Sequence, residues 1–226
     1  MVVSPAMQEY LAEAYRLAHY QSDDPYVSTS ALAEVLNVSP PAVTRMVQRL
    51  KDAGYLEHEP YRGIRLTPEG EYEALMSIRR HRLVERFLVD VMGFGWHEVH
   101  ETADELGATV GDMVVERMSE MAGHPRRCPH GEPIPSPDGV MPQVIDRPLT
   151  SVPQGEYILS RVHTHDANKL RYLDHLTLKP GTRFEVVHLA PFNGPLHLMV
   201  NGTEHHIGHE LAGNLRVSTP EEFARL

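Results

Sequence analysis

Apolar residues recur at helical spacing along the first third of the chain. The pattern predicts three helices, over residues 7–20, 28–36 and 40–53. Ser28 or Ser30 is expected to cap the second helix, because a hydroxyl group there accepts a hydrogen bond from a free backbone N–H. Pro40 and Pro41 suit the first turn of the third helix, and Gly54 ends that helix.

A hairpin is predicted after the three helices. Alternating apolar and polar residues indicate short strands at 55–58 and 64–67, joined by a turn at 61–63. A helix, a helix-turn-helix and a hairpin in this order are typical of a winged helix, which commonly places its second motif helix in the major groove of DNA. The alternative is an interaction module with a solvated polar face, because the fold also serves protein contacts.

The polar residues of the predicted recognition helix and wing are candidates for DNA contact. They include hydroxyl, amide and guanidinium groups, which can bind base edges and phosphates. Arg62 lies at the predicted tip of the wing, where it can enter a minor groove. The full candidate set is Thr29, Ser39, Pro41, Ala42, Thr44, Arg45, Gln48, Arg49 and Arg62.

Helical periodicity continues to about residue 121, after which the pattern changes. A long helix from 68 to about 92 is followed by two shorter helices, 99–106 and 111–121, with apolar stripes suited to dimerisation.

Residues 122–153 hold eight of the eighteen prolines, which predicts an extended, stiff linker. Beyond the linker a helix is expected at 168–175. Five short strands are expected at 157–162, 183–189, 196–200, 203–207 and 215–218.

These elements predict a mainly α protein with a small β domain. A winged helix-turn-helix over 1–74 is followed by a helical dimerisation domain over 75–143. Residues 144–226 comprise the end of the proline-rich linker and a C-terminal domain whose strands are expected to close into a small barrel.

Composition and charge narrow the functional classes. The 226 residues are 41% hydrophobic and 23% charged, as in ordinary globular proteins. One cysteine excludes an intramolecular disulfide, and the first residues contain neither a basic nor a long apolar leader segment. We therefore expect a cytoplasmic protein with no membrane partner and no small organic ligand. The net charge of −10 is concentrated in residues 81–143, which carry −6, so the winged helix can still bind DNA.

Fifteen histidines and an acidic middle third suit the binding of divalent cations. Two potential ligands four residues apart can bind one ion from one helix face, and this spacing occurs on two successive predicted helices. One such pair is usually a surface ion pair, but burying many carboxylates and imidazoles together without a cation is costly. The candidate ligands are Glu9, His81, Glu85, His100, Asp104, Cys128, His130 and Asp166.

Four motifs then resemble the diphtheria toxin repressor family of iron- and manganese-dependent transcriptional repressors. They are VSPPAVTRMVQRL at 38–50, YRGIRLTPEG at 61–70, RHRLVERFL at 80–88 and CPHGEPIP at 128–135. The resemblance implies a metal-binding dimerisation domain, an SH3-like (FeoA-like) C-terminal domain and a homodimer on a palindromic operator in double-stranded DNA. It also implies two Mn(II) or Fe(II) ions per subunit, with Zn or Cd able to substitute in vitro, and it looks closest to the manganese-responsive branch.

The resemblance assigns a primary metal site that is incomplete in this chain. His81 and Asp104 match ligand positions on the helices, and Glu9 matches the ligand from the first helix. The Glu-His pair that family members carry three and four residues after the Asp104 position is replaced by Gly107 and Ala108, whose side chains cannot bind metal. The remaining carboxylate and imidazole ligands suit Mn(II), with Fe(II) second.

A second site is implied by the same resemblance. Glu85, Cys128, His130 and Asp166 match a secondary site of members with the Cys-Pro-His-Gly motif. Glu85, His100 and Asp166 match the ancillary site of iron-type members, so the choice between Cys128 and His100 stays open.

These expectations describe a metal-dependent repressor of metal-homeostasis genes, in which the metal favours the dimer geometry that fits the operator. One alternative is a winged-helix DNA binder that is independent of metal or responds to oxidation of Cys128. Another is a metalloenzyme built on His81, Glu85 and His100, but the chain has no His-Glu-x-x-His signature. We therefore do not expect an enzyme.

Overall fold

A computed structural model describes residues 3–20 and 24–225, although the side chain of residue 20 lies outside this description. The chain forms two compact units. The first contains Met1–Arg80 together with Pro135–Met141, and the second contains His81–Ile134 together with Pro142–Leu226. Among the described residues no helix has both the length and the apolar character needed to cross a membrane.

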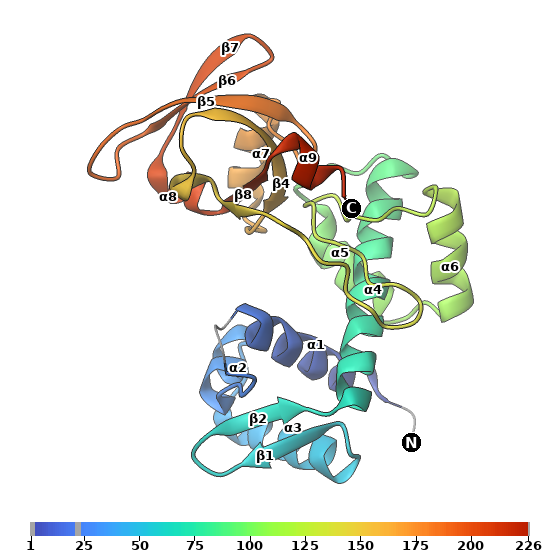
Figure 1. The fold of residues 1–226 in the computed structure, drawn as a ribbon. Helices are drawn as coiled ribbons and strands as arrows, with labels where there is room; N and C mark the ends of the chain where they lie inside the picture. The colour runs from blue at the N-terminus through green and yellow to red at the C-terminus, as the bar shows by residue number, and fades with distance from the viewer. Residues whose placement is uncertain (1–2, 21–23, 226) are drawn as a thin grey trace. The chain divides into compact units, whose positions relative to one another are not determined.

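The first unit contains the predicted helices and hairpin (Figure 1). Antiparallel pairing joins the two strands, from Leu56 opposite Leu66 to Glu59 opposite Gly63. The Ser28 hydroxyl accepts a hydrogen bond from the backbone N–H of Ala31, so Ser28 is the cap of the second helix. The elements are α1 (Pro5–Tyr20), α2 (Thr29–Val35), α3 (Pro40–Asp52), β1 (Leu56–Glu59), β2 (Gly63–Leu66) and the start of α4 (Pro68–Asp90).

Helix α3 has one buried face and one exposed face. Val43, Val47 and Leu50 recur at helical spacing and are buried in the core of the unit, whereas the polar positions between them are exposed. Gly63 at the start of β2 has a φ of +122°, and a side chain there would collide with the Val27 carbonyl group. Glycine is therefore required where the wing meets the segment before α2.

The helical part of the second unit packs around apolar residues of α4. Leu83 contacts Val115 and Ile134, while Val84 and Leu88 pack with α5. This part consists of α4 from His81 onward, α5 (Val99–Gly107) and α6 (Asp112–Met121).

The rest of the second unit is a six-stranded antiparallel sheet in the order β3-β8-β4-β5-β6-β7. All five predicted strands are confirmed, and the two-residue strand β3 is an addition. A buried core of leucine, valine and aromatic residues covers one face. The elements are β3 (Arg147–Pro148), η1 (Leu149–Ser151), β4 (Gly155–Val162), α7 (Ala167–His175), β5 (Arg183–Leu189), β6 (Leu196–Val200), β7 (Thr203–Ile207), α8 (His209–Gly213), β8 (Leu215–Ser218) and α9 (Pro220–Phe223).

The proline-rich segment is more than a spacer. It contains no helix or strand between residues 122 and 146, yet residues 128–135 are buried apart from Glu132. Arg82 of α4 donates a hydrogen bond of 2.5 Å to the carbonyl group of Pro133, which holds the segment against the helix. The segment therefore forms part of the packed interior.

Candidate metal centre

Six of the eight predicted metal ligands gather in two neighbouring groups within the second unit. Within each group the ligand atoms lie no more than 4.8 Å from one another. Glu85 links the groups, because its Oε1 lies 3.1 Å from His81 Nε2, 3.3 Å from His100 Nδ1 and 3.4 Å from His130 Nδ1. The groups are His81, His100 and Asp104, and Glu85, Cys128 and His130.

Two helices supply the first group. His81 lies one turn before Glu85 on α4, and His100 lies one turn before Asp104 on α5. Asp104 Oδ1 is 2.8 Å from His81 Nδ1 and Asp104 Oδ2 is 3.8 Å from His100 Nε2, so the carboxylate bridges the imidazoles.

A tight turn supplies Cys128 and His130. The backbone N–H of Gly131 donates to the Cys128 carbonyl group at 2.9 Å, and the Cys128 N–H donates to the Glu132 carbonyl group at 2.9 Å. Gly131 has a φ of +88°, and a side chain at this position would collide with the backbone of Ser160 on β4. The glycine thus lets the turn approach the sheet closely enough to place the thiol and the imidazole beside Glu85.

The orientation of His130 suits metal binding. Its Nε2 lies 2.9 Å from the Trp96 carbonyl oxygen, which can only accept a hydrogen bond and so assigns the ring proton to Nε2. When the imidazole is neutral, as it is when it binds a metal, the lone pair of Nδ1 is therefore on the side of Glu85. Nδ1 is buried and makes no hydrogen bond with the described residues. A cation fits this position, because Glu85, Cys128 and His130 are all buried and together offer oxygen, sulfur and nitrogen ligands.

The electrostatics of the cluster depend on Glu85, which is 2% exposed. Burial favours a raised pKa for its carboxyl group, but the neighbouring imidazoles of His81, His100 and His130 outweigh this and hold the pKa well below its usual range. Burial lowers the pKa of His81 and His130, whereas the acidic groups around them raise the values to about 9 and about 10. Protons on these imidazoles balance the buried carboxylate, and a divalent cation can replace them.

His165 is a further imidazole at the cluster. Its ring stacks on His100 with 3.7 Å between ring centroids, and its centroid lies 5.3 Å from that of His130. His165 is exposed at the edge of the cluster, and partial desolvation of its ring together with the neighbouring imidazoles lowers its pKa. His163 and His165 are evident in the sequence beside the α7 cap, but sequence reasoning selected the adjacent Asp166 as the ligand.

Asp166 and Glu9 have other surroundings. Asp166 is exposed, and its carboxylate caps α7 by accepting hydrogen bonds from the backbone of Asn168 at 2.8 Å and of Lys169 at 3.1 Å. Glu9 is exposed on α1 of the first unit, so its role as a ligand stays a prediction. Gly107 and Ala108 lie at the C-terminal end of α5, and neither has a side-chain atom that can bind metal.

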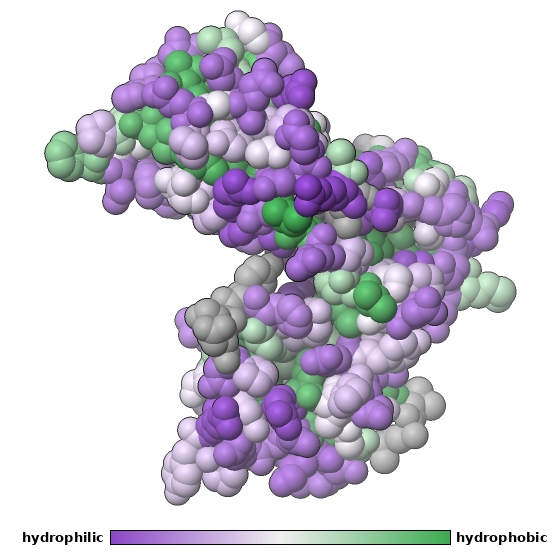
Figure 2. All heavy atoms as spheres, viewed as in Figure 1, coloured by the Kyte–Doolittle hydropathy of each residue, from purple (hydrophilic) through white to green (hydrophobic). Residues whose placement is uncertain are grey.

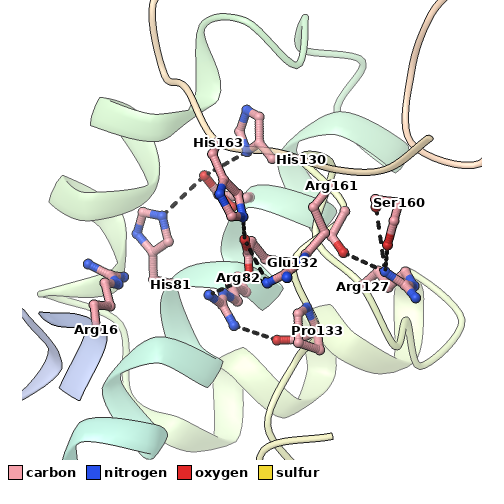
Figure 3. Close-up of polar contacts among 12 residues, drawn as sticks. Arg16, His81, Arg82, Arg127, His130, Glu132, Pro133, Ser160, Arg161 and His163 are labelled. Carbon is pink, nitrogen blue, oxygen red and sulfur yellow. Dashed lines mark hydrogen bonds and ion pairs between the residues drawn. The ribbon is translucent and has the colours of Figure 1, made fainter. Parts of the chain in front are cut away.

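The ion pairs of Glu132 hold the turn that carries Cys128 and His130 in place. Glu132 lies 3.3 Å from Arg82, 3.3 Å from Arg161 and 3.1 Å from His163 (Figure 3). Burial raises the pKa of Glu132, but His163 and the two arginines lower it to about 2, so the group is an anion at neutral pH. Figure 3 also shows His81 on α4 and His130 on the turn pointing toward the same space.

The predicted DNA contacts lie on the surface of the first unit. Thr44, Arg45, Gln48 and Arg49 are exposed on α3, with Ser39 at its N-cap and Pro41 and Ala42 in its first turn. Thr29 begins α2. In the space-filling view the surface around the hairpin is mainly hydrophilic (Figure 2), and the polar positions of α3 are exposed. A recognition helix needs such a polar outer face.

Arg62 occupies the wing between β1 and β2. Its guanidinium group lies over the Tyr26 ring, 3.9 Å from the centroid, and 3.5 Å from the Glu59 carboxylate. The side chain is half exposed, so it can exchange these partners for a phosphate group.

Three regions of the chain match family descriptions. Residues 3–64 match "Iron dependent repressor, N-terminal DNA binding domain", and residues 67–136 match "Iron dependent repressor, metal binding and dimerisation domain". Residues 147–219 match "FeoA domain".

Individual relatives agree with these matches. The diphtheria toxin repressor of Corynebacterium glutamicum is 29% identical over 84% of this chain and 87% of its own length. The iron-dependent repressor IdeR of Mycobacterium tuberculosis is 38% identical over 46% of this chain and 45% of its own length. A solved manganese-dependent transcriptional repressor in complex with manganese is 31% identical, covers 93% of this chain and 98% of its own, and has a TM-score of 0.85.

Proposed function

Because the chain belongs to the diphtheria toxin repressor family of metal-dependent transcriptional repressors, we propose that its buried ligand cluster senses Mn(II) or Fe(II) and thereby controls binding to a palindromic operator. The family consists of regulators with DNA-binding and metal-binding domains, not enzymes. Its domains indicate DNA and a second copy of the chain as partners. The genes controlled are proposed to be those of metal homeostasis.

One observation carries the proposal: a carboxylate that is 2% exposed lies within 3.4 Å of three imidazoles from three segments of the chain. Such a group is stable only when its charge is balanced, either by protons on the imidazoles or by a cation. Protons on the imidazoles therefore balance the carboxylate when metal is scarce, and a bound cation balances it when metal is abundant.

We assign two ion positions to each subunit. His81, His100 and Asp104 hold one, and Glu85, Cys128 and His130 hold the other. The first group contains nitrogen and oxygen ligands and no thiolate, so it can hold Mn(II), and then Fe(II), where the cell supplies these ions. The thiol of Cys128 makes the second group better suited to softer ions, so Zn(II) or Cd(II) can bind there in vitro. A relative of this chain has been solved with bound Zn²⁺ and also with bound Cd²⁺.

The first ion position has few side-chain ligands, because Gly107 and Ala108 stand where family members carry a Glu-His pair. Asp104 partly compensates, because it bridges His81 and His100. Water can fill the remaining positions, as it does in many Mn(II) and Mg(II) sites. His165 stacks on His100 and restricts its ring, which favours a fixed ligand geometry.

The residues of the cluster connect the metal-binding domain to the sheet domain. His81 and Glu85 belong to α4, His130 to the packed turn, and His165 to the segment between β4 and α7. A divalent cation supplies two positive charges that let these groups lie together without extra protons. The metal-loaded arrangement then favours the dimer that fits the operator, and operator affinity rises by the same coupling free energy.

The test is the substitution Glu85→Ala in the full-length protein. We expect operator binding that no longer responds to Mn(II), while weak non-specific binding remains, because the substitution removes the central anion and leaves the winged helix intact. Glu105→Ala is the matched control, since Glu105 is exposed on α5 and belongs to neither ligand group. A normal metal dose response in Glu85→Ala would overturn the assignment of the site.

A further inference from the structure

Three histidines form a row across the C-terminal sheet, and none of them belongs to the ligand cluster above. His188 of β5 pairs with His197 of β6, and His197 pairs with His206 of β7. Cross-strand partners point to the same face of a sheet, so the three imidazoles lie side by side. Their ring centroids are 5.4 Å apart between the first two and 4.0 Å apart between the second two.

The row lies on the outer face of the sheet. Leu196, Leu198 and Val200 of β6 are buried, whereas His197 and Met199 between them are only half-buried. Because side chains alternate between the two faces of a strand, the histidines face away from the core. The site is thus open to ions from solution.

Glu204 completes a set of three ligands. It lies two residues before His206 on β7 and therefore shares its face. Its Oε1 is 3.6 Å from His197 Nδ1 and 3.5 Å from His206 Nε2. The ligand atoms of His197, Glu204 and His206 all lie within 4.8 Å of one another.

These separations match the geometry of a bound transition-metal ion. Tetrahedral ligands with bonds of roughly 2.1 Å lie roughly 3.4 Å from one another. Glu204 Oε1 lies 3.5 Å from His206 Nε2 and 3.6 Å from His197 Nδ1, close to this value, and the two imidazole nitrogens lie within 4.8 Å of each other. The strand pairing from Leu196 opposite Ile207 to Val200 opposite Thr203 fixes the side chains that bear the ligands. The site is therefore largely preformed.

We propose that His197, Glu204 and His206 form a separate transition-metal site on the outer face of the sheet. We expect Zn(II), Cu(II) or Ni(II) to bind there, because a given set of nitrogen and oxygen ligands holds these ions more tightly than Mn(II) in the general affinity order of divalent metals. A water molecule takes the fourth position. His188 contacts the His197 ring edge to face and restricts its rotation. An ion here ties the edge strand β7 to β6, because the ligands come from both strands.

The test measures zinc bound per chain. Metal-free full-length protein is dialysed against Zn(II) at a fixed free concentration, and bound zinc is determined by elemental analysis. We expect His197→Gln combined with His206→Gln to bind one zinc ion fewer per chain than the natural protein. His205→Gln is the matched control, because His205 lies on β7 opposite Leu198 and faces away from the row. Equal zinc in all three proteins would overturn the proposal.

A second variant keeps the test decisive if the double substitution disturbs folding. Glu204 is half exposed, so Glu204→Gln changes a surface carboxylate without opening the core. We expect this change to weaken zinc binding at the outer site at least about tenfold, measured in competition with a chromophoric chelator. An unchanged zinc affinity would contradict the role of Glu204. The Mn(II) response of operator binding should stay normal in these variants, which separates this site from the proposed sensor.

Discussion

At the scale of single residues, Gly131 combines a positive φ with a close approach to another part of the backbone. Its φ of +88° disfavours any residue with a side chain, and a side chain would also collide with the backbone of Ser160. The turn that presents Cys128 and His130 therefore depends on glycine. Sequence inspection identifies the Cys-Pro-His-Gly motif, but the reason for its glycine is evident only once the turn is seen against β4.

We expect Gly131→Ala to lower the free energy of unfolding by about 1–3 kcal/mol, the usual cost of a strained backbone conformation. Metal binding should weaken as well, since the thiol and imidazole move with the turn. Thermal unfolding in chelator and in Mn(II) measures both effects. Gly111→Ala is the control, because a side chain at Gly111 meets open space and needs no unusual backbone angle. Equal behaviour of the two variants would contradict the role of the close approach.

Cys128 distinguishes metal sensing from redox sensing. It is buried, and burial raises the pKa of its thiol, which disfavours the reactive thiolate. We expect Cys128→Ser to keep a weakened Mn(II) response, because the other ligands remain. The measurement is operator binding against Mn(II) concentration, with and without hydrogen peroxide. A peroxide response that is present in the natural protein and lost in Cys128→Ser would favour the redox alternative.

At the scale of elements, the helical periodicity and the strand alternation located most of the fold. The third helix was predicted over 40–53 and is observed at Pro40–Asp52, because its buried stripe and its terminal proline and glycine are local signals. Short elements such as β3 and α9 were missed, since a two-residue strand has no periodicity. The proline-rich segment was predicted as a linker, because nothing in its composition indicates that it packs into the interior.

Long-range contacts explain the other omissions at the sites. His165 is close to His100 only because the segment before α7 lies against α5, and no local pattern encodes this. The row of His188, His197 and His206, by contrast, could be predicted in part from local sequence. The Asn201-Gly202 turn between the predicted strands implies the register that pairs His197 with His206, so the information was present in the sequence.

Helix α3 supports a prediction about DNA recognition. Arg45 is exposed on its outer face, where it can reach a base edge or a phosphate group. We expect Arg45→Ala to weaken operator binding by about 1–3 kcal/mol if it contacts a base, and by a smaller amount that is uniform across sequences if it contacts phosphate. Arg117→Ala removes the same charge from the exposed surface of α6 and is the control. Equal losses in the two variants would mean that only net charge matters.

The ion pairs of Asp146 support a prediction about pH. Its buried carboxylate lies 2.6 Å from Arg161 of β4 and 2.5 Å from Arg216 of β8. Burial raises its pKa, but the two guanidinium groups lower it below its ordinary value. The ion pairs therefore stabilise the fold fully above the pKa of the unfolded chain, about 3.9, and this contribution is lost as the pH falls through the lower folded-state pKa.

We expect Asp146→Asn to lower the free energy of unfolding at neutral pH by about 3 kcal/mol. Below about pH 4 the gap between the two proteins should narrow, because the unfolded natural chain is protonated first and the ion pairs of the folded protein are lost at its lower pKa. Chemical denaturation across this pH range provides the measurement. A gap that stays constant down to pH 2 would contradict the assigned pKa direction.

At the scale of the whole molecule, the two units have complementary chemistry. The first presents a polar recognition helix and an arginine-bearing wing, and the second holds a buried carboxylate among imidazoles. The acidic middle third carries much of the net charge of −10, so its neutralisation by cations also reduces repulsion from DNA phosphates. Metal loading and DNA binding are thus expected to favour each other, and the coupling must be reciprocal.

The most direct measurement is a titration of an operator fragment from a manganese-transporter promoter with the natural protein at fixed salt. It is run first in chelator and then with Mn(II), Fe(II) and Zn(II) in turn. Affinity that rises at micromolar Mn(II) or Fe(II) is the predicted result, and it ranks the ions. Equal affinity in chelator and in metal would contradict metal sensing. It would mean that, with Gly107 and Ala108 in place of two ligands of the family, metal binding no longer changes operator affinity.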